Sequence, residues 1–369
     1  MSKIVGATVR PCVQPLRDAS WKFARASLAR LDGHVLELID DDGQRGLGYV
    51  HAIPAITTQG SGAQAALEFL IPLLIGREVD DLAAITELLD ATLAGNASVK
   101  AGIDMALHDL LARRLGVPVH LLLGGALRSR IPQARILAIK SPAEMGAQAA
   151  LRVAEGFMQL KLKLSGDTSL DVQRIAAVRE AAGPDAVLTL DPNQSYSAKQ
   201  MMSAFTRMER HGIALIEQPV PAADWAGLAL LTRSLPCAIE ADESAQTVHD
   251  VFRLVSERMV DIVNLKITKL GGIRRFVEAL RICEAGGVGC RVGAAFGPSL
   301  LQAMGVQVAS LPKALPFACE LSEHQHLLDD PFQDLPVVDG AIAVSRLPGC
   351  GIEWITRPSS ETTHQETYP

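Results

Sequence analysis

Three acidic residues that each end a short apolar run could together bind a divalent cation. Asp191, Glu217 and Asp242 stand in the contexts Leu-Asp-Pro-Asn-Gln, Ile-Glu-Gln-Pro and Ala-Asp-Glu-Ser. If the three runs are neighbouring parallel strands, the carboxylates converge and repel one another unless a cation neutralises them. Hard oxygen ligands favour Mg²⁺, with Mn²⁺ also possible. A solvated acid is the simpler interpretation of any one residue, but three in phase with a repeat favour a metal site.

Three lysines accompany these acids along the chain. Lys161 and Lys163 alternate with leucines, so both side chains share one face of a strand. Lys266 ends a later run, on the opposite side of the expected site. A lysine buried beside other cations and a metal has a lowered pKa, which makes it a competent base for a weakly acidic carbon proton. The alternative is a pocket in which the lysines bind a carboxylate or phosphate without proton transfer.

Strand-like and helical segments alternate from about residue 135, which is typical of βα units around a parallel sheet. The polar residues above recur at intervals of one strand plus one returning helix. Such units close most naturally into an α/β fold of the modified TIM-barrel type, with its chemistry at the carboxyl ends of the strands. A doubly wound open sheet is disfavoured because no glycine-rich phosphate loop follows the first strand. The eight predicted strands are Arg135–Ile139, Gln159–Leu164, Val187–Asp191, Ala214–Glu217, Ala238–Asp242, Ile262–Lys266, Val288–Gly293 and Phe317–Leu321.

The N-terminal part reads as an α+β cap. We expect residues 1–130 to form this cap, residues 131–334 to form the barrel, and residues 335–369 to pack back on the cap. The predicted cap strands are Ile4–Arg10, His34–Asp40 and Gly46–His51, and the predicted helices are Ser61–Ile75, Asp81–Leu93 and Ala97–Leu115.

Composition narrows the classes of partner. The longest apolar runs are too short for a membrane span, and the start of the chain lacks a secretory signal. The six cysteines have neither paired nor metal-finger spacing, so we expect a cytoplasmic protein. Basic residues are dispersed and the net charge is −6, which argues against nucleic acid. A small-molecule substrate is expected, and a homo-oligomer is expected because capped barrels often pair.

The ordered motifs Lys-x-Lys, Asp-x-Asn, Glu-Gln-Pro, Asp-Glu-Ser and Asn-x-Lys resemble the muconate-lactonizing subgroup of the enolase superfamily. The stretch Ala101–Gly125, with Asp-Met-Ala-Leu-His-Asp and Leu-Leu-Leu-Gly-Gly, is similar to that family's cap-to-barrel signature. The resemblance covers nearly the whole chain. It implies that Asp191, Glu217 and Asp242 hold Mg²⁺, to which a substrate carboxylate binds.

The resemblance also implies roles for the lysines. Lys163 and Lys266 would stand on opposite faces of the α-carbon, and each would remove or return its proton. Lys161 would stabilise the enolate oxygens. Asn193 and Glu243 would support the metal carboxylates, with Glu243 placed to pair with Lys266.

Other positions separate the branches of this family. The seventh strand, Cys290–Gly293, has no histidine, which disfavours the mandelate-racemase branch. Dipeptide epimerases carry Asp-x-Asp after the eighth strand, whereas this segment reads Cys319-Glu320-Leu321-Ser322. It is more similar to muconate cycloisomerases, although Ser-Glu-His replaces the usual Gly-Pro. Glu320 is either a substrate contact for a cationic group, an acid, or a plain strand-end residue.

The substrate pocket should also draw on the cap and on one loop of the barrel. Trp21, Lys22 and Arg25 are expected to cover the barrel mouth and meet an anionic substrate, and Phe296 lies in a small, flexible loop that would shape the pocket. The pair His324 and His326 is expected to face solvent rather than bind metal.

Three functions remain open at this point. The first is an isomerase, either a cycloisomerase or a racemase or epimerase that uses both lysines. The second is a lyase that expels a β-hydroxyl from the same enolate, as in hydroxyproline-type dehydratases or o-succinylbenzoate synthases. The third is a catalytically silent barrel that binds carboxylates, against which three acids together with three lysines argue.

Overall fold

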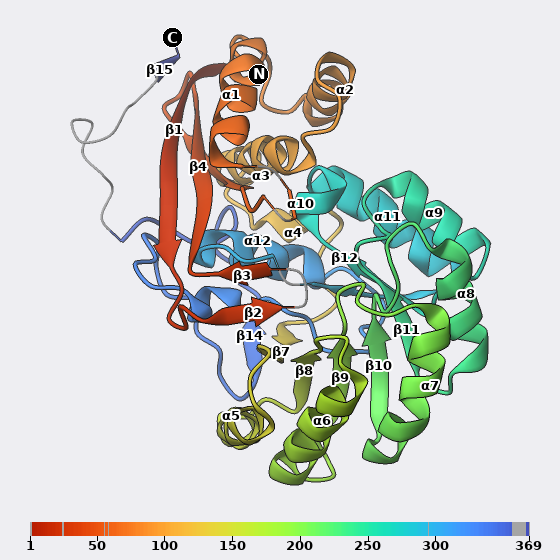
Figure 1. The fold of residues 1–369 in the computed structure, drawn as a ribbon. Coiled ribbons are helices and arrows are strands. Elements are labelled where there is room, and N and C mark those ends of the chain that lie inside the picture. The colour runs from red at the N-terminus through yellow and green to blue at the C-terminus, as the bar shows by residue number, and fades with distance from the viewer. Residues whose placement is uncertain are drawn as a thin grey trace.

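The N-terminal part of the computed structural model is an antiparallel sheet with helices packed on it (Figure 1). The structure describes residues 2–23, 26–54, 56–57, 59–293, 295–355 and 367–368. The sheet order is β15-β1-β4-β5. Its strands are β1 (Ile4–Pro15), β4 (Arg30–Asp40), β5 (Arg45–His51) and β15 (Thr367–Tyr368), and its helices are α1 (Gly60–Leu70), η1 (Ile71–Leu73), α2 (Leu82–Thr92) and α3 (Ala97–Arg114). The three predicted strands and three predicted helices are all present. The β2–β3 hairpin (Trp21–Phe23 and Ala26–Leu28) and the edge strand β15 were not predicted.

Helix α3 lies unusually close to strand β5. Gly48 faces the backbone oxygen of Gly102, and Gly46 faces that of Ala106, at separations that leave no room for a Cβ atom on either strand glycine. Glycine at both positions therefore lets the helix backbone approach the strand directly. This close packing buries nearly the whole of α3.

The signature motif on α3 connects the cap to the rest of the molecule. Asp104 accepts a hydrogen bond from the backbone N–H of Ile273, at the first turn of α11, with a separation of 2.5 Å. Asp109 accepts from the N–H groups of Leu47 (2.9 Å) and Cys350 (2.7 Å). The two acids thus fix α3 to a barrel helix, to the cap sheet and to the C-terminal segment.

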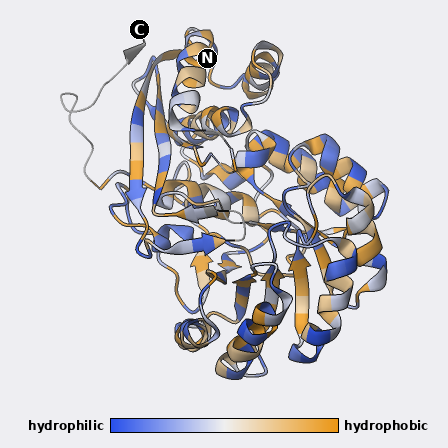
Figure 2. Cartoon of the chain, in the orientation of Figure 1, coloured by the Kyte–Doolittle hydropathy of each residue, from blue (hydrophilic) through white to orange (hydrophobic). Residues whose placement is uncertain are grey.

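Seven parallel strands form the curled sheet of the barrel, in the order β13-β12-β11-β10-β9-β8-β7. The helices lie on its outer side, and the strands are the most hydrophobic part of the domain (Figures 1 and 2). The strands are β7 (Ala134–Leu137), β8 (Gln159–Lys163), β9 (Val187–Asp191), β10 (Ile213–Glu217), β11 (Ala238–Ala241), β12 (Ile262–Leu265) and β13 (Gly289–Val292). The helices are α5 (Pro142–Ala154), α6 (Thr168–Ala182), α7 (Ala198–Met208), η2 (Glu209–His211), α8 (Trp225–Ser234), α9 (Val248–Ser256), α10 (Ile267–Leu270), α11 (Ile273–Gly286) and α12 (Ser299–Ala309). An α/β barrel with an N-terminal cap is therefore confirmed.

The predicted eighth strand is not a regular strand. Within the predicted range Phe317–Leu321, only Cys319 forms a β-bridge, with Gln133. The backbone still joins the two edges of the sheet, because the N–H of Glu320 donates to Val292 O (2.9 Å) and the N–H of Ala134 donates to Cys319 O (2.8 Å). A two-residue seam thus occupies the place of the eighth strand.

The segment after the seam returns across the molecule. Strand β14 (Ala341–Ala343) pairs with β6 (Arg130–Pro132), and Arg113 of α3 donates to Ile352 O at 3.0 Å. The remaining short helices are α4 (Val119–Leu122) and η3 (Glu323–His326). Residue 352 thus contacts α3 of the cap, residues 356–366 and 369 lie outside the described part of the chain, and the domain organisation stays a prediction.

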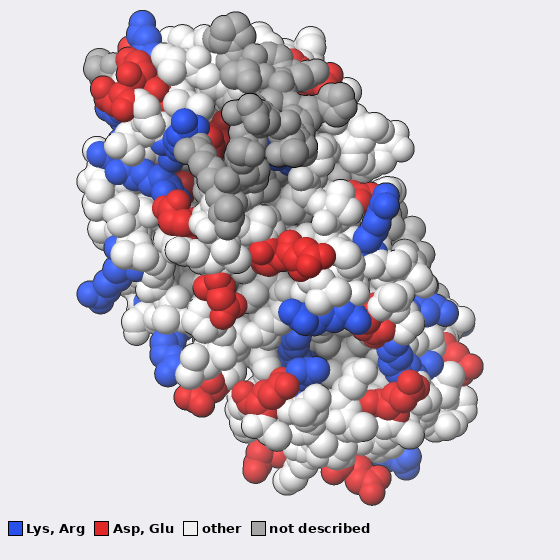
Figure 3. Space-filling view, turned by 90° about the vertical axis from the view of Figure 1, so that its left-hand side faces the viewer, with Lys and Arg blue, Asp and Glu red and all other residues white. Residues whose placement is uncertain are grey.

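The outer surface carries charges of both signs. On the face shown in Figure 3, separate basic and acidic groups are scattered over the part of the surface that the structure describes. No helix in the described ranges is both long enough and apolar enough to cross a bilayer.

Candidate active site

The three predicted acids lie at the carboxyl ends of adjacent strands. Asp191 ends β9, Glu217 ends β10 and Asp242 follows β11, and all three side chains are buried. Gln218, which follows β10, holds the end of β11 beside it. Its Oε1 accepts hydrogen bonds from the backbone N–H groups of Asp242 and Ser244, both at 3.0 Å. The motif Glu-Gln-Pro therefore supplies one candidate ligand and the support of another.

The predicted lysines reach these acids from both sides. Lys163 Nζ lies 2.5 Å from Asp191 Oδ2, and Lys266 Nζ lies 2.5 Å from Asp242 Oδ2. Lys161 Nζ contacts both Asp191 (3.0 Å) and Glu217 (2.6 Å). Because three strands separate β8 from β12 in the curled sheet, Lys163 and Lys266 reach the site from opposite sides of the barrel mouth.

A fourth lysine belongs to the same cluster and was missed in the sequence. Lys269 of α10 forms an ion pair with Asp242 Oδ1 and donates to the backbone oxygen of Asp242 at 2.6 Å. It lies one helical turn after Lys266, so both ammonium groups bind one carboxylate. The spacing Lys-x-x-Lys at the start of a helix was the signal that could have revealed it.

A buried arginine below the lysines was also missed. Arg291 of β13 is fully buried and binds Glu240 through two nitrogens, at 2.7 and 2.6 Å. It also pairs with Glu217 and, at 2.9 Å, with Glu320. Asn264 donates to the second oxygen of Glu217 at 3.1 Å. Glu217 is therefore held by an arginine, a lysine and an amide.

Burial and neighbouring charges shift the pKa values of these groups in opposite directions. Burial and the carboxylate of Asp191 raise the pKa of Glu217 well above its usual value. Burial acts the same way on Asp242, but Lys266 and Lys269 outweigh it and hold the pKa of that carboxyl well below its usual value. The sequence predicted a lowered pKa for a buried lysine. Burial does lower the pKa of Lys266, yet the negative charges of Asp242 and Glu217 together outweigh burial, and the pKa is raised.

The lysines open into one cavity of about 330 Å³ at the mouth of the barrel. Its polar side is formed by Lys161, Lys163, Asn193, Gln194, Asp242, Glu243, Gln246, Lys266 and Lys269. Its apolar side is formed by Trp21, Phe23, Leu28, Ile56, Ile136, Ala222 and Phe296. Trp21 and Phe296 are in edge contact, with ring centroids 5.4 Å apart, so the unpredicted hairpin and the barrel loop together cover the lysines.

The other predicted substrate contacts have different positions. Lys22 is exposed and is not among the residues that line this cavity, because alternate side chains of β2 point to opposite sides. Glu320 is fully buried beneath the cavity, within 3.0 Å of Lys161, rather than in its lining. Arg25 lies outside the described residues.

Glu243 and the histidine pair His324 and His326 are placed differently from the predictions. Glu243 accepts a hydrogen bond from Asn193 at 3.3 Å, whereas the ion pair of Lys266 is made with Asp242. His324 is buried and its Nε2–H donates to Leu335 O (2.9 Å), and His326 packs on Trp21 with centroids 4.4 Å apart. The two histidines therefore belong to the packing of this region rather than to a solvent-facing loop.

The strand-end acids suit a divalent cation. Asp191 and Glu217 both contact Lys161, and Asp242 follows the adjacent strand, so the three buried carboxylates lie at one end of the sheet, although their oxygens are not all within 4.8 Å of one another. Oxygen donors of this kind are the ligands of Mg²⁺. Among the described residues, three acids with oxygens within 4.8 Å of one another occur at the β4–β5 turn, as Asp40, Asp41 and Asp42. Arg114 binds two of these turn acids, which accounts for them without a metal.

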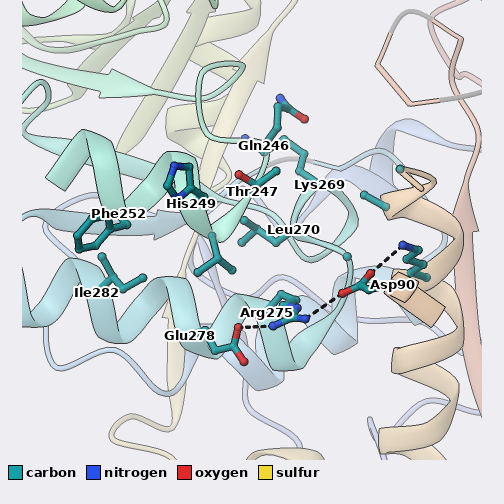
Figure 4. Close-up of a pocket in the computed structure, with 15 residues that line it drawn as sticks. Asp90, Gln246, Thr247, His249, Phe252, Lys269, Leu270, Arg275, Glu278 and Ile282 are labelled. Atoms are coloured by element: carbon teal, nitrogen blue, oxygen red, sulfur yellow. Dashed lines mark hydrogen bonds and ion pairs between the residues drawn. The ribbon is translucent and has the colours of Figure 1, made fainter. Parts of the chain in front are cut away.

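A larger cavity of about 630 Å³ lies next to the active site, between the cap and the barrel (Figure 4). Gln246 and Lys269 line both cavities. Within it, Arg275 of α11 binds Asp90 of α2 at 2.9 Å and Glu278 at 2.9 Å, and Lys100 also binds Asp90. These charges satisfy one another and tie the cap to the barrel.

Comparison with known proteins shows the family. Residues 5–124 match the mandelate racemase/muconate lactonizing enzyme N-terminal domain, and residues 144–357 match the enolase C-terminal domain-like family. The chain belongs to the muconate-lactonizing subgroup of the enolase superfamily, and it is an enzyme of that superfamily.

The individual relatives are isomerases. The chain is 31% identical to the L-Ala-D/L-Glu epimerase of Clostridium acetobutylicum over 74% of its own length and 77% of the relative. It is 32% identical to muconate cycloisomerase 1 of Rhodococcus opacus, with 79% of each chain covered. The crystal structure of an N-succinyl Arg/Lys racemase from Bacillus cereus superposes with a TM-score of 0.92, at 28% identity and 95% coverage of both chains.

Proposed function

We propose that the protein is a Mg²⁺-dependent isomerase that removes and returns a proton on the carbon next to a substrate carboxylate. The observation that carries this proposal is that Lys163 and Lys266 line one cavity from opposite sides of the barrel mouth. Each lysine lies beside its own buried acid. Relatives that include epimerases, a racemase and cycloisomerases support the same chemistry.

The side chains divide the work as follows. Asp191, Glu217 and Asp242 would hold the ion, which when bound draws in the substrate carboxylate and stabilises negative charge. One of Lys163 and Lys266, in its neutral form, takes the α-proton to its Nζ, and the electron pair of the broken C–H bond passes into the carboxylate group to give an enolate. The other lysine, as an ammonium, returns a proton to the opposite face, so the configuration inverts.

The remaining residues of the cavity set its environment. Lys161 lies at the centre of the acids and would share the charge of the enolate oxygens. The apolar side formed by Trp21, Phe23 and Phe296 supports a substrate whose distal part is apolar and would exclude water from the reacting carbon.

Deuterium incorporation tests this proposal directly. The protein is incubated in D₂O with Mg²⁺ and separate dipeptides, N-succinyl amino acids and muconates, and products are read by mass spectrometry and chiral chromatography. Native protein should incorporate one deuterium at the α-carbon. Lys163→Ala and Lys266→Ala should each reduce net inversion by about 10²–10⁴-fold, whereas exposed Lys199→Ala on α7 should not change it.

The other outcomes identify the alternatives. Undiminished inversion in Lys266→Ala would exclude the two-lysine mechanism. A product lighter by one water would identify a lyase, and ligand binding without any exchange would identify a silent barrel.

A further inference from the structure

A separate cavity of about 590 Å³ lies behind the wall of the active site. Trp21 and Ile136 line both this cavity and that of the lysines. The complete lining consists of Arg17, Asp18, Trp21, Arg135, Ile136, Gln148, Arg152, Glu155, Phe157, Gln325, His326 and Val337. The segment before β2, strand β7, helix α5 and helix η3 thus meet around it. We call it the arginine pocket.

The arginine pocket has more positive charge than its own acids neutralise. Asp18 pairs with Lys140 at 2.9 Å, and Glu155 pairs with Arg152 at 2.6 Å. Among the described residues, no acid lies within ion-pair distance of Arg17 or Arg135. Arg17 is exposed and donates to Gln325 O at 3.1 Å, so the pocket opens to solvent on its side.

Arg135 is the buried part of this charge. It is 3% exposed, and its orientation is fixed by bonds to Ser322 O (2.9 Å) and Oγ (3.2 Å) and by the ring of Phe157, 5.6 Å away. Its Nε is nevertheless buried without a hydrogen-bond partner. A guanidinium that is rigidly held and incompletely bonded is costly to bury, and an oxyanion is its natural partner.

The neighbouring titratable groups agree with a positive pocket. Burial, together with the charges of Arg135 and Arg152, lowers the pKa of His326 well below its usual value, so the imidazole is neutral. Its Nε2 has no hydrogen-bond partner and lies 3.8 Å from Glu323 Oε2. The buried acid that acts on Arg135 is Glu323, and burial raises the pKa of this carboxyl to about 7, so it is only partly charged at neutral pH.

We propose that the arginine pocket binds a small organic or inorganic anion that bears a carboxylate or phosphate group, with Arg135 and Arg17 as its cationic ligands. Phe157, Ile136 and Val337 offer apolar surface to the rest of such a molecule. This site is independent of the proposed reaction. A bound anion would also touch the rear of Trp21, which forms part of the active-site wall.

Trp21 lines the arginine pocket, so its fluorescence can report an anion bound there. In a Trp225→Phe/Trp354→Phe background, Trp21 is the one remaining tryptophan. Its fluorescence is followed while inorganic phosphate or succinate is added at constant ionic strength. We expect a saturable change with at least one of the two, and comparison of the two arms identifies the preferred anion. Each of the substitutions Arg17→Gln and Arg135→Gln should raise the apparent Kd by about tenfold or more.

Matched variants keep the test decisive. Arg281→Gln, an exposed arginine of α11, should leave the Kd unchanged. Lys163→Ala should also leave it unchanged, because an anion in the arginine pocket does not contact the catalytic lysines. Circular dichroism verifies that Arg135→Gln is folded, and exposed Arg17→Gln provides the test if it is not. A change that does not saturate, that survives in Arg17→Gln, or that disappears in Lys163→Ala would overturn the proposal.

Discussion

Arg291 is the residue on which three buried acids of the barrel interior depend. Its guanidinium binds Glu240, Glu217 and Glu320, and its side chain has no exposed surface. Replacing it with methionine keeps most of the volume but leaves the acids without this partner. We therefore expect Arg291→Met to lower the free energy of unfolding by about 3–5 kcal/mol, measured by urea denaturation.

A second substitution separates charge from packing. In Glu240→Gln/Arg291→Met, the acid bound most extensively by Arg291 is neutral, so a substantial part of the lost stability should return. If the double variant is as unstable as Arg291→Met, the loss comes from packing and not from unpaired charge.

At this scale the sequence predicts some positions and not others. Asp191, Glu217 and Asp242 could be found because each ends an apolar run, and strand ends meet at one edge. Arg291 could not be found in the same way, because its partners belong to other strands and only the closed sheet brings them together. An arginine inside an apolar barrel strand is still a signal that an acid must face it.

Among the elements, helix α11 depends on an acid from another domain. Its N-cap is Gly272, which has a positive φ of 136° and no side chain, and Asp104 of α3 supplies the missing acceptor for Ile273 N–H. We expect Asp104→Ala to lower the free energy of unfolding by about 1–3 kcal/mol. Thermal or urea unfolding measures this loss.

Helix α2 provides the comparison. Asp81 stands at the N-cap of α2 but makes no side-chain capping bond, so Asp81→Ala should change stability by less than about 0.5 kcal/mol. Equal effects of the two substitutions would show that Asp104 does not act through the end of α11.

The elements themselves differ in how well the sequence predicts them. Seven barrel strands can be predicted because each is a short, mostly apolar run and the runs recur along the chain. Strands that are buried on both faces need such runs. The eighth is reduced to the contacts of Cys319 and Glu320, which no local pattern distinguishes from a short strand. The hairpin from Trp21 is held by contacts with Phe296 and His326, which are distant in sequence, so local signals do not reveal it.

For the whole molecule, metal binding should increase the free energy of unfolding. An ion that binds only the folded chain stabilises it by about 2.7 kcal/mol at a concentration one hundred times its Kd. We expect Mg²⁺ to raise the Tm relative to protein in EDTA, by about 2–4 °C for each kcal/mol in a chain of this order of size. Glu217→Gln should abolish the increase.

The acidic turn of the cap is the matched control for that measurement. Asp41 belongs to the cluster of Asp40, Asp41 and Asp42, which also presents three carboxylates. Asp41→Asn should keep the Mg²⁺-dependent increase in Tm in full. An increase lost in Asp41→Asn but retained in Glu217→Gln would place the ion at the turn instead of at the strand ends.

The seam at Cys319 and Glu320 has a consequence for how the molecule opens. Most neighbouring strands are joined by ladders of three to five residue pairs, whereas here the backbone hydrogen bonds that close the ring come from Cys319 and Glu320, with side-chain bonds of Gln133 and Gln159 beside them. Local fluctuations begin where the fewest bonds must break. Glu320 also binds Lys161, whose ammonium lies among the candidate metal ligands. A transient breach of the ring would therefore disorganise the active site while both halves of the barrel stay folded, so inactivation on heating should begin below the temperature of global unfolding.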